Sequence, residues 1–590
     1  MSKNEDSNSN NMNSEDYDQR QGNHNDVNEH MHEKLEIIDE VIANPDLVQI
    51  GSEAKAAEER MFSRNFTGFG LDMNVFVSLA SAILVLGFIV FTIIWPDTAA
   101  SFFGGINSFI NEHFSWLYVF TINAAFFFLI VIGLSKLGRI RLGGYTARPE
   151  YSNAAWYAMM FSAGIGIGIF FYGVAEPILH QDIPEGLKSG SVLDNFKVMY
   201  MHWGGHAWAA YGLVAIGLGY FAYNKKLPFA PRSLFYPLIK EKIYGILGDI
   251  IDTVAVLSVL FGLATSLGLG AQQINSGLSY LTGLPFDPIV QIILIISITT
   301  FATLSVVSGL NKGIKILSEA NMVVSGLLLL GILLIGPTVY ILSTYLSGMG
   351  LYLRDFFNIA MYTAVEPSEK AWQAGWTVFY WAWWISWTPF VGTFIARISK
   401  GRTVREVALG AIVLPTIIIT SAMTILGAAG VKLNDIYEGA IEKAINQNMS
   451  TAIFEMFNYL TDSVLLRSLL SLVAIIAIVI FFVTSSDSGS FVVSSLTSSG
   501  RDEPPKVQRI FWAAMEGAIA LSVLLIGGEQ ALTTIQSAVI IMGLPFAVIL
   551  IMIMIALNKE LRESYKKYTY NRTVTLKLML EKIGKKPKIK

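Results

Sequence analysis

The side chains with the clearest chemical meaning form an aromatic run between Trp381 and Phe394, which reads WAWWISWTPFVGTF. It contains four tryptophans, one proline and no charged residue. The negative face of an aromatic ring attracts cations, above all quaternary ammonium ions, which cannot be hydrogen-bonded. Packing between helices is the alternative, and it would explain an isolated tryptophan. The density of this run favours an aromatic surface that binds a cation.

A second aromatic group lies in the segment 202–211, which reads HWGGHAWAAY. At about 100° per residue, Trp203, Trp208 and Tyr211 lie on one face of a helix. Two aromatic faces without a charge between them suit a bulky cation with little hydrogen-bonding capacity. On the later run, the residues that share a face are Trp383, Trp387, Phe390 and Phe394, with Trp384 one step around the helix.

His202 and His206 are four residues apart, as two zinc ligands on one helix would be. A zinc site needs further ligands, and the sequence offers no neighbouring carboxylate or third histidine to complete this pair. We therefore expect no metal there. The chain has no cysteine, which excludes disulfides, thiolate metal sites and cysteine nucleophiles. No nucleophile–base pair stands out, so we do not expect an enzyme.

Three alternating glycines, Gly164, Gly166 and Gly168, stand in the middle of an apolar segment. Each costs a helix about 1 kcal/mol relative to alanine, so we predict that the helix breaks here. Backbone carbonyl groups freed inside a membrane can bind Na⁺. Close packing of helices through small residues is the alternative explanation.

Hydroxyl groups are concentrated in the segment 481–488, which reads FFVTSSDS. Thr484 and Ser485 could complete an oxygen shell around Na⁺ that the glycine-rich segment begins. Hydroxyls on membrane helices also bond back to the carbonyls of their own helix, and that alternative stays open.

The elements that hold these groups are predicted to be membrane helices. Of the 590 residues, 53% are hydrophobic and only 15% are charged, whereas soluble domains carry about 25% charge. Apolar segments of about 20 residues or more are interpreted as membrane spans. Twelve such segments lie near 71–95, 114–137, 152–175, 196–223, 249–280, 286–308, 318–346, 372–397, 404–430, 463–490, 508–529 and 531–557.

Two of these spans are predicted to be interrupted. The third contains the glycines, and the eighth contains Trp387-Thr388-Pro389, where proline removes a helical hydrogen bond. Interrupted helices five spans apart fit an inverted repeat of spans 3–7 and 8–12. We therefore predict an all-α membrane protein with a ten-helix, 5+5 core preceded by two peripheral helices.

The ends of the chain differ from its apolar body. Residues 1–64 contain 15 acidic and 6 basic side chains and are typical of a disordered tail. Residues 558–590 contain 11 basic and 3 acidic side chains, which could contact anionic lipid. Lys and Arg are concentrated in the loops after even-numbered spans, which predicts that both termini are cytoplasmic. The predicted divisions are 1–64, 65–150 (two peripheral spans), 151–349 (first repeat), 350–371 (a surface helix, centred on 350–366), 372–557 (second repeat) and 558–590.

The chain closely resembles the betaine–choline–carnitine transporter family over all twelve spans. The motifs that show this are GIGIGIFFYGVAEP at 164–177, HWGGHAWAAY at 202–211 and WTVFYWAWWISWTPFVGTFIARISKGRT at 376–403. The resemblance implies a carrier in the bacterial cell membrane that imports a compatible solute for osmoprotection. It also implies a homotrimer, with the surface helix in the contact between subunits.

The resemblance assigns roles to individual residues. It implies a cation cage of Trp203, Trp208, Tyr211 and Trp384, with Trp387 close by, and an aromatic exit path of Trp383, Phe390 and Phe394. It implies a sodium site formed by the main-chain oxygens of Ser162, Ile165 and Phe481 and the hydroxyls of Thr484 and Ser485. A second sodium site of the family falls on Val259 and Leu263, which have no side-chain oxygen.

The resemblance also bears on the substrate. Choline carriers of the family tend to have an acidic residue where this chain has Gly168, whereas zwitterionic betaine needs no such partner. Glycine betaine with sodium is therefore expected. Carnitine, ectoine, choline and proline stay open as substrates, and proton coupling stays open through Glu176, Glu319, Asp487 or Glu516. A membrane sensor that binds an osmolyte without moving it is the alternative from another class.

Overall fold

The structure, a computed structural model, describes residues 59–582 except Tyr145, Ile165 and the segments 181–182, 309–310 and 528–530. Most of the predicted N-terminal tail and the last eight residues, 583–590, lie outside the described residues. The rest of the predicted C-terminal tail, up to Lys582, continues the last helix.

A short antiparallel hairpin precedes the first span of this helical protein. Strand β1 (Asn65–Gly68) pairs with β2 (Leu71–Asn74). Phe69 and Gly70 connect them with positive φ angles of 52° and 75°, which is the geometry of the tight turns that favour hairpins. The first helix therefore begins at Val75 instead of 71, where the Asn74 side chain accepts a hydrogen bond from the Val77 amide at 3.0 Å.

All other long elements are helices. In the first half they are α3 (Val75–Ile94), α4 (Pro96–Leu134), α5 (Asn153–Gly164), α6 (Gly168–Leu179), α7 (Asp194–Trp203), α8 (Gly205–Gly219), α9 (Tyr236–Ile239), α10 (Ile246–Thr282), α11 (Pro288–Ser308) and α12 (Asn311–Ile335). In the second half they are α13 (Thr338–Ala360), α14 (Pro367–Gln373), α15 (Phe379–Ile398), α16 (Val404–Ile436), α17 (Ala440–Gln447), α18 (Ala452–Leu460), α19 (Val464–Thr497), α20 (Lys506–Gly527) and α21 (Ala531–Lys582).

Nine of the described helices are long and apolar enough to cross a membrane, so this is a multi-pass membrane protein. They are α3, α4, α10, α11, α12, α16, α19, α20 and α21. The predicted spans missing from this set are the third, fourth and eighth. The third and fourth are divided into short helices, and the eighth, α15, is rich in tryptophan and tyrosine.

The interruptions differ in part from those predicted. The third span breaks at the glycines as predicted, between the end of α5 at Gly164 and the start of α6 at Gly168. The fourth breaks at Gly204, which the sequence analysis missed. The predicted break of the eighth span is wrong, because α15 continues through Pro389 and its only irregularity is a π-helical turn at Ala374–Val378 just before it. A proline removes one hydrogen bond, and the buried surroundings hold the helix together around it.

Two other boundaries need correction. The second span begins at Pro96, eighteen residues before the predicted start at 114. The seventh ends at Ile335 instead of 346, because the Gly336-Pro337 pair that follows stops a helix. The predicted surface helix at 350–366 is therefore α13, which begins at Thr338 and ends at Ala360.

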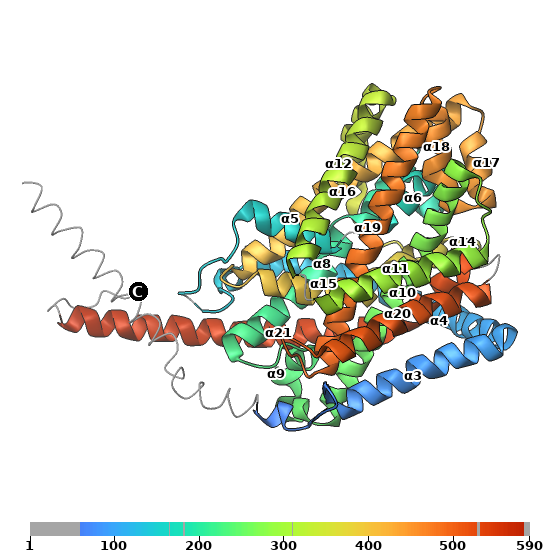
Figure 1. Cartoon of the computed structure of the whole chain (residues 1–590). Coiled ribbons are helices and arrows are strands. Elements are labelled where there is room, and N and C mark those ends of the chain that lie inside the picture. The colour runs from blue at the N-terminus through green and yellow to red at the C-terminus, as the bar shows by residue number, and fades with distance from the viewer. Residues whose placement is uncertain are drawn as a thin grey trace, which may run out of the picture.

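The helices that carry the two aromatic groups pack against each other at the centre of the bundle. The largest helix–helix contact in the described part of the chain is that of α15 with α8, and α6 packs along α16. Other contacts occur in corresponding pairs. Helix α10 contacts α20 and α21, while α19 makes the corresponding contacts with α11 and α12. Figure 1 shows α3 along the outside of the bundle and α21 as one long helix that leaves it.

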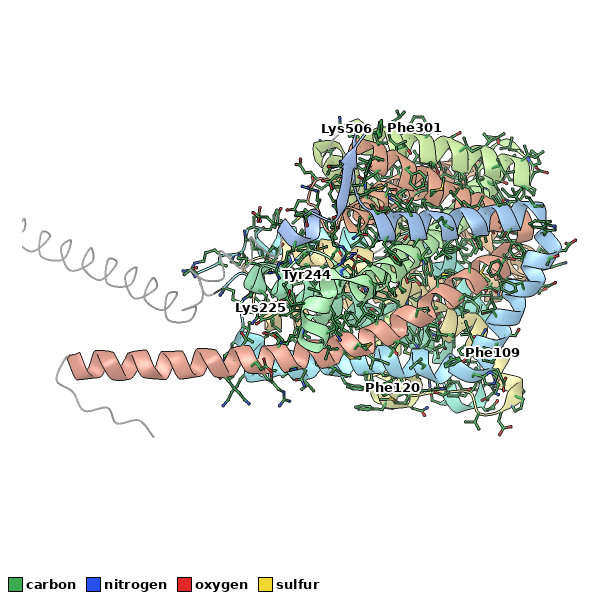
Figure 2. All side chains as sticks on the ribbon, turned by 90° about the horizontal axis from the view of Figure 1, so that it is seen from below. Phe109, Phe120, Lys225, Tyr244, Phe301 and Lys506 are labelled. Carbon is green, nitrogen blue, oxygen red and sulfur yellow. The ribbon has the colours of Figure 1, made fainter. Side chains whose placement is uncertain are left out.

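The outer surface is apolar, as a lipid-facing surface must be. Figure 2 shows Phe109, Phe120 and Phe301 at the periphery, where each residue is more than half exposed. Lys225 and Tyr244 lie near the end where α21 leaves the bundle, and Lys225 forms an ion pair with Glu560 of α21 at 2.5 Å.

An ion-pair network fastens α13 to the core. Lys197 on α7 is fully buried and contacts Asp194 at 2.8 Å and Asp355 of α13 at 2.9 Å. A hydrogen bond from Arg354, with a further one from Lys197, lowers the pKa of Asp355 to about 2. A carboxylate held in this way stabilises the fold above the pKa of the unfolded chain, and that contribution is lost as the pH falls from about 4 to 2.

We expect Asp355→Asn to lower the free energy of unfolding by about 1–3 kcal/mol, because Lys197 loses one of its two charged partners while it stays buried. Thermal melting of the purified protein at neutral pH measures this change. Glu185→Gln, which removes an exposed ion pair with Lys188, is the matched control and should leave the melting temperature unchanged. Equal melting of Asp355→Asn and the wild type would show that the network does not fasten α13.

Candidate functional site

A cavity lies where the broken third span meets α7, α8, α15 and α16. The empty space around its wall atoms, the adjoining solvent included, is about 380 Å³, and about 20 Å³ of it is cavity volume open to a water molecule. Its wall is almost entirely aromatic, aliphatic or glycine backbone. The lining residues are Gly164, Gly166, Gly168, Trp203, Ala207, Trp208, Tyr211, Trp383, Trp384, Trp387 and Ile419.

The structure brings the five predicted substrate-binding residues together in this wall. The rings of Trp203 and Trp384, from different spans, meet edge to face with centroids 5.1 Å apart. Trp208 and Tyr211 are perpendicular to each other at 5.8 Å, and Trp387 completes the set. We call these five residues the cage. Rings at steep angles to one another can surround a rounded cation, as quaternary ammonium is.

The predicted exit-path residues are divided. Trp383 lies in the cavity wall itself, stacked on Trp384 with centroids 4.9 Å apart and planes 11° apart. Phe390 packs against Trp387 at 5.7 Å and is not part of the wall. Phe394, one turn further along α15, is half-buried and also lies outside the wall.

The glycines of the broken span are required by close approach to the tryptophans. A Cβ atom at Gly164 would lie 2.5 Å from Trp208, and one at Gly168 would lie 2.7 Å from Trp203 and 2.9 Å from Trp383. Side-chain carbons do not approach this closely. The backbone of the third span therefore forms one wall of the cavity, directly against the indole rings.

The wall also contains polar hydrogens without partners. Among the described residues, no hydrogen-bond partner is found for the hydroxyl of Tyr211 or for the Nε1 atoms of Trp383 and Trp387, although all three are buried. Buried donors of this kind are usually paired. Trp387 Nε1 lies beside α10, 3.2 Å from the position that a Cβ of Gly262 would occupy, and Gly262 is not a lining residue. The donors left for an anionic group of a bound molecule are therefore those of Tyr211 and Trp383.

The predicted sodium ligands can be placed only in part. Ile165 lies outside the described residues, as does the side chain of Ser162. On α19, Thr484 donates its hydroxyl hydrogen to the Ile480 carbonyl at 2.8 Å, so the oxygen lone pairs stay available. Phe481, whose carbonyl is the third predicted ligand on this side, lies one turn before it and is buried.

Ser485 connects α19 to the broken span. Its hydroxyl oxygen lies 3.9 Å from the position that a Cβ of Gly166 would occupy. The Ser485 hydroxyl therefore lies beside the backbone break. On α10, Val259 and Leu263 are fully buried apolar residues, and they offer no side-chain oxygen.

A buried carboxylate behind the cage is a feature that spacing alone did not show. Glu176 on α6 is fully buried. Its Oε2 accepts hydrogen bonds from Trp203 Nε1 at 2.7 Å and from the Tyr380 hydroxyl at 2.6 Å. Its Oε1 lies 2.8 Å from His202 Nδ1. The carbonyl of His202 in turn accepts a hydrogen bond from Trp384 Nε1 at 2.9 Å.

These contacts correct the argument about the histidines. His202 does have a carboxylate and a second histidine nearby, because ligand atoms of Glu176, His180 and His202 lie within 4.8 Å of one another. His206 belongs elsewhere, stacked on Phe126 at 4.6 Å. A metal ion at the first three residues would displace hydrogen bonds that already engage both oxygens of Glu176.

The other carboxylates considered for proton coupling lie away from the cavity wall. Asp487 accepts a hydrogen bond from Ser305 at 2.6 Å, and Glu516 accepts one from Ser490 at 2.9 Å. Glu319 lies on α12.

The sequence analysis missed two lining residues, Ala207 and Ile419. Neither has a signal that distinguishes it from the many apolar residues of its span. Glu176 had a signal, a carboxylate inside an apolar segment, which marks a functional candidate in a membrane protein. Its actual partners come from helices far apart in the chain.

Comparison with known proteins gives one consistent result. The family model described as the betaine/carnitine/choline family transporter matches residues 76–566. A glycine betaine transporter of Acinetobacter baylyi is 42% identical over 500 residues, which cover 83% of this chain and 74% of that protein. A glycine betaine/proline/choline/ectoine transporter of Vibrio parahaemolyticus is 41% identical and covers 85% and 89%. A probable glycine betaine transporter of Desulfitobacterium hafniense is 37% identical and covers 84% and 99%.

Proposed function

Because the chain belongs to the betaine/carnitine/choline family of transporters, we propose that it imports glycine betaine, a quaternary-ammonium compatible solute, by symport with sodium. The observation that carries this proposal is the cavity, whose wall combines five cage aromatics with unpaired hydrogen-bond donors. As a member of a transporter family, the protein is a carrier and not an enzyme.

The cavity matches the two ends of betaine. Its trimethylammonium group forms no hydrogen bonds and fits against the ring faces of the cage. Its carboxylate can accept hydrogen bonds from Tyr211 or Trp383, whose polar hydrogens are unpaired among the described residues. No lining residue is charged, so no anion in the wall opposes the carboxylate. Choline has a hydroxyl in place of the carboxylate and would accept weaker hydrogen bonds from these donors.

The proposed architecture has twelve spans with a 5+5 inverted repeat. The helix contacts support this repeat. In the first half, α10 contacts α20 and α21 of the second half, and its counterpart α19 contacts α11 and α12 of the first half. We place both termini in the cytoplasm and the basic end of α21 near anionic lipid. A homotrimer with α13 in the subunit contact follows from the family resemblance.

Sodium is the proposed coupling ion. The support is the position of Ser485 beside Gly166 and the free lone pairs of Thr484. Hard oxygen ligands of this kind suit a small cation. The buried carboxylates Asp487 and Glu516 are the residues through which protons would act instead.

Uptake of radiolabelled betaine into proteoliposomes tests the function. We expect accumulation driven by an inward sodium gradient and none driven by a proton gradient alone. Accumulation with protons and without sodium would reassign the coupling ion. Binding of betaine without accumulation under either gradient would show a sensor and overturn the proposal.

We expect the double variant Thr484→Ala with Ser485→Ala to raise the sodium concentration for half-maximal uptake about tenfold or more. Sodium loses two of its few oxygen ligands, and water does not replace them easily inside a membrane. Sodium titration of betaine uptake measures the change. Ser494→Ala removes a buried hydroxyl from the same helix and should leave the titration unchanged. An unaltered sodium dependence of the double variant would place the ion elsewhere.

A further inference from the structure

Glu176 lies two helical turns after Gly168 on α6, on the far side of Trp203 from the cavity. The six-membered ring of Trp203 approaches Gly168 in the cavity wall, while its Nε1 donates to the Glu176 carboxylate at 2.7 Å. One indole ring therefore separates the carboxylate from the cavity. Glu176 also reaches a second cage residue, Trp384, through Tyr380. The Tyr380 hydroxyl donates to Glu176, and its ring stacks on Trp384 at 5.9 Å with planes 12° apart.

The hydrogen bonds of this carboxyl group fit its ionised form. Indole N–H groups only donate, and the Trp203 indole and the Tyr380 hydroxyl both point at Oε2. Oε1 lies 2.8 Å from His202 Nδ1, which donates to it when the neutral ring carries its hydrogen on that nitrogen. His202 is satisfied as a neutral ring, which donates from Nδ1 and accepts from the Thr377 hydroxyl at 3.1 Å through Nε2.

The charge of Glu176 has no permanent partner. Among the described residues, no lysine or arginine forms an ion pair with it, and the basic groups next to it are the histidines His180 and His202. A buried charge without a partner is unfavourable in a protein interior, most of all within a membrane. A cation bound in the cage would supply the missing partner at a short distance through weakly screening surroundings.

We propose that Glu176 provides the counter-charge for the ammonium group of the substrate and acts on it through the rings of the cage. Its hydrogen bonds to the Trp203 indole and the Tyr380 phenol increase the negative charge of rings that face or support the cavity, which strengthens their attraction for a cation. This inference rests on the proposed function, since it specifies how the same site recognises its substrate class.

Placing the charge behind a ring instead of in the wall has a consequence for the substrate. Gly168 leaves no space for a side chain, so the wall contains no anion that would repel the carboxylate of a zwitterion. The ammonium group is still attracted to the side of the cavity where Trp203 lies. The site is thereby selective for a quaternary cation over a neutral molecule of the same shape.

The test compares glycine betaine with its uncharged-head isostere, 3,3-dimethylbutanoate, in which carbon replaces the ammonium nitrogen. Equilibrium binding of each ligand to the purified full-length protein is followed by tryptophan fluorescence in saturating sodium. The wild type should prefer betaine. We expect Glu176→Gln to reduce that preference at least tenfold, because the variant should bind betaine more weakly and the isostere with unchanged affinity. Tyr380→Phe, which removes a donor but leaves the charge, should keep most of the preference.

The possible outcomes separate this inference from the proposed function. A wild type that binds neither ligand would overturn the proposed function. A wild type that prefers betaine, together with a Glu176→Gln variant that keeps the same preference, would overturn only the counter-charge. If the Glu176→Gln variant lost affinity for betaine and for the isostere equally, Glu176 would have only a structural role. That result would also overturn the counter-charge. Should the glutamine variant not fold, the double variant Glu176→Gln with Tyr380→Phe removes one of the two donors at Oε2 and gives the same comparison.

Discussion

Replacing Trp384 by leucine is expected to raise the half-saturation concentration for betaine uptake about thirtyfold. Trp384 forms one side of the cage, and its orientation is held by the hydrogen bond to the His202 carbonyl and by stacking on Trp383. A cation–π contact in a desolvated site contributes about 2 kcal/mol, and that loss corresponds to roughly thirtyfold in affinity. Leucine fills part of the space but has no ring face.

The measurement is concentration-dependent uptake in proteoliposomes at saturating sodium. Trp512→Leu is the matched control, because Trp512 is equally buried and hydrogen-bonded, to Thr497, but lies on α20 away from the cavity. It should lower thermal stability without changing the half-saturation concentration. A Trp384→Leu protein with wild-type half-saturation would place substrate binding outside this cavity.

Replacing Gly168 is expected to have an effect of similar size for a different reason. The Cβ of Gly168→Ala would lie 2.7 Å from Trp203 and 2.9 Å from Trp383, so at least one ring of the site must move. Overpacking of this kind costs about 1–3 kcal/mol, which corresponds to a loss of betaine affinity of roughly 5- to 150-fold. Gly105→Ala on α4, where the new Cβ would meet nothing within 4 Å, should leave affinity unchanged.

Gly168→Asp adds a charge to the same steric effect. We expect lower uptake of both substrates and a shift of preference from betaine toward choline, because the new carboxylate repels that of betaine and attracts the ammonium of choline. The measurement is the inhibition of labelled betaine uptake by choline in Gly168→Ala and in Gly168→Asp. The difference between these two variants isolates the effect of the charge. An unchanged ratio between these two variants would mean that residue 168 does not face the substrate.

Several features of this protein were determined by sequence alone because they depend on residues close together in the chain. Long apolar segments predict membrane helices wherever they occur, and nine of them are found as such in the part of the chain that the structure describes. Alternating glycines weaken a helix locally, so the break between α5 and α6 could be predicted. The aromatic groups at 202–211 and 381–394 are each close together in the chain, and their residue types already indicated a cation as the ligand.

Features that depend on contacts between distant segments were decided only by the tertiary structure. Helix α15 continues through Pro389 because it is buried against α8 on one side and α21 on another, whereas proline in isolation predicts a break. Trp383 lies in the cavity wall because Gly168, from another span, approaches its ring.

The clearest case is Glu176. Its sequence neighbours show only a carboxylate in an apolar helix, which left its role open. The structure surrounds it with donors from α7 and α15 and places it one ring away from the cavity. A buried charge takes its meaning from the groups that surround it in space, and no spacing along one helix contains that information.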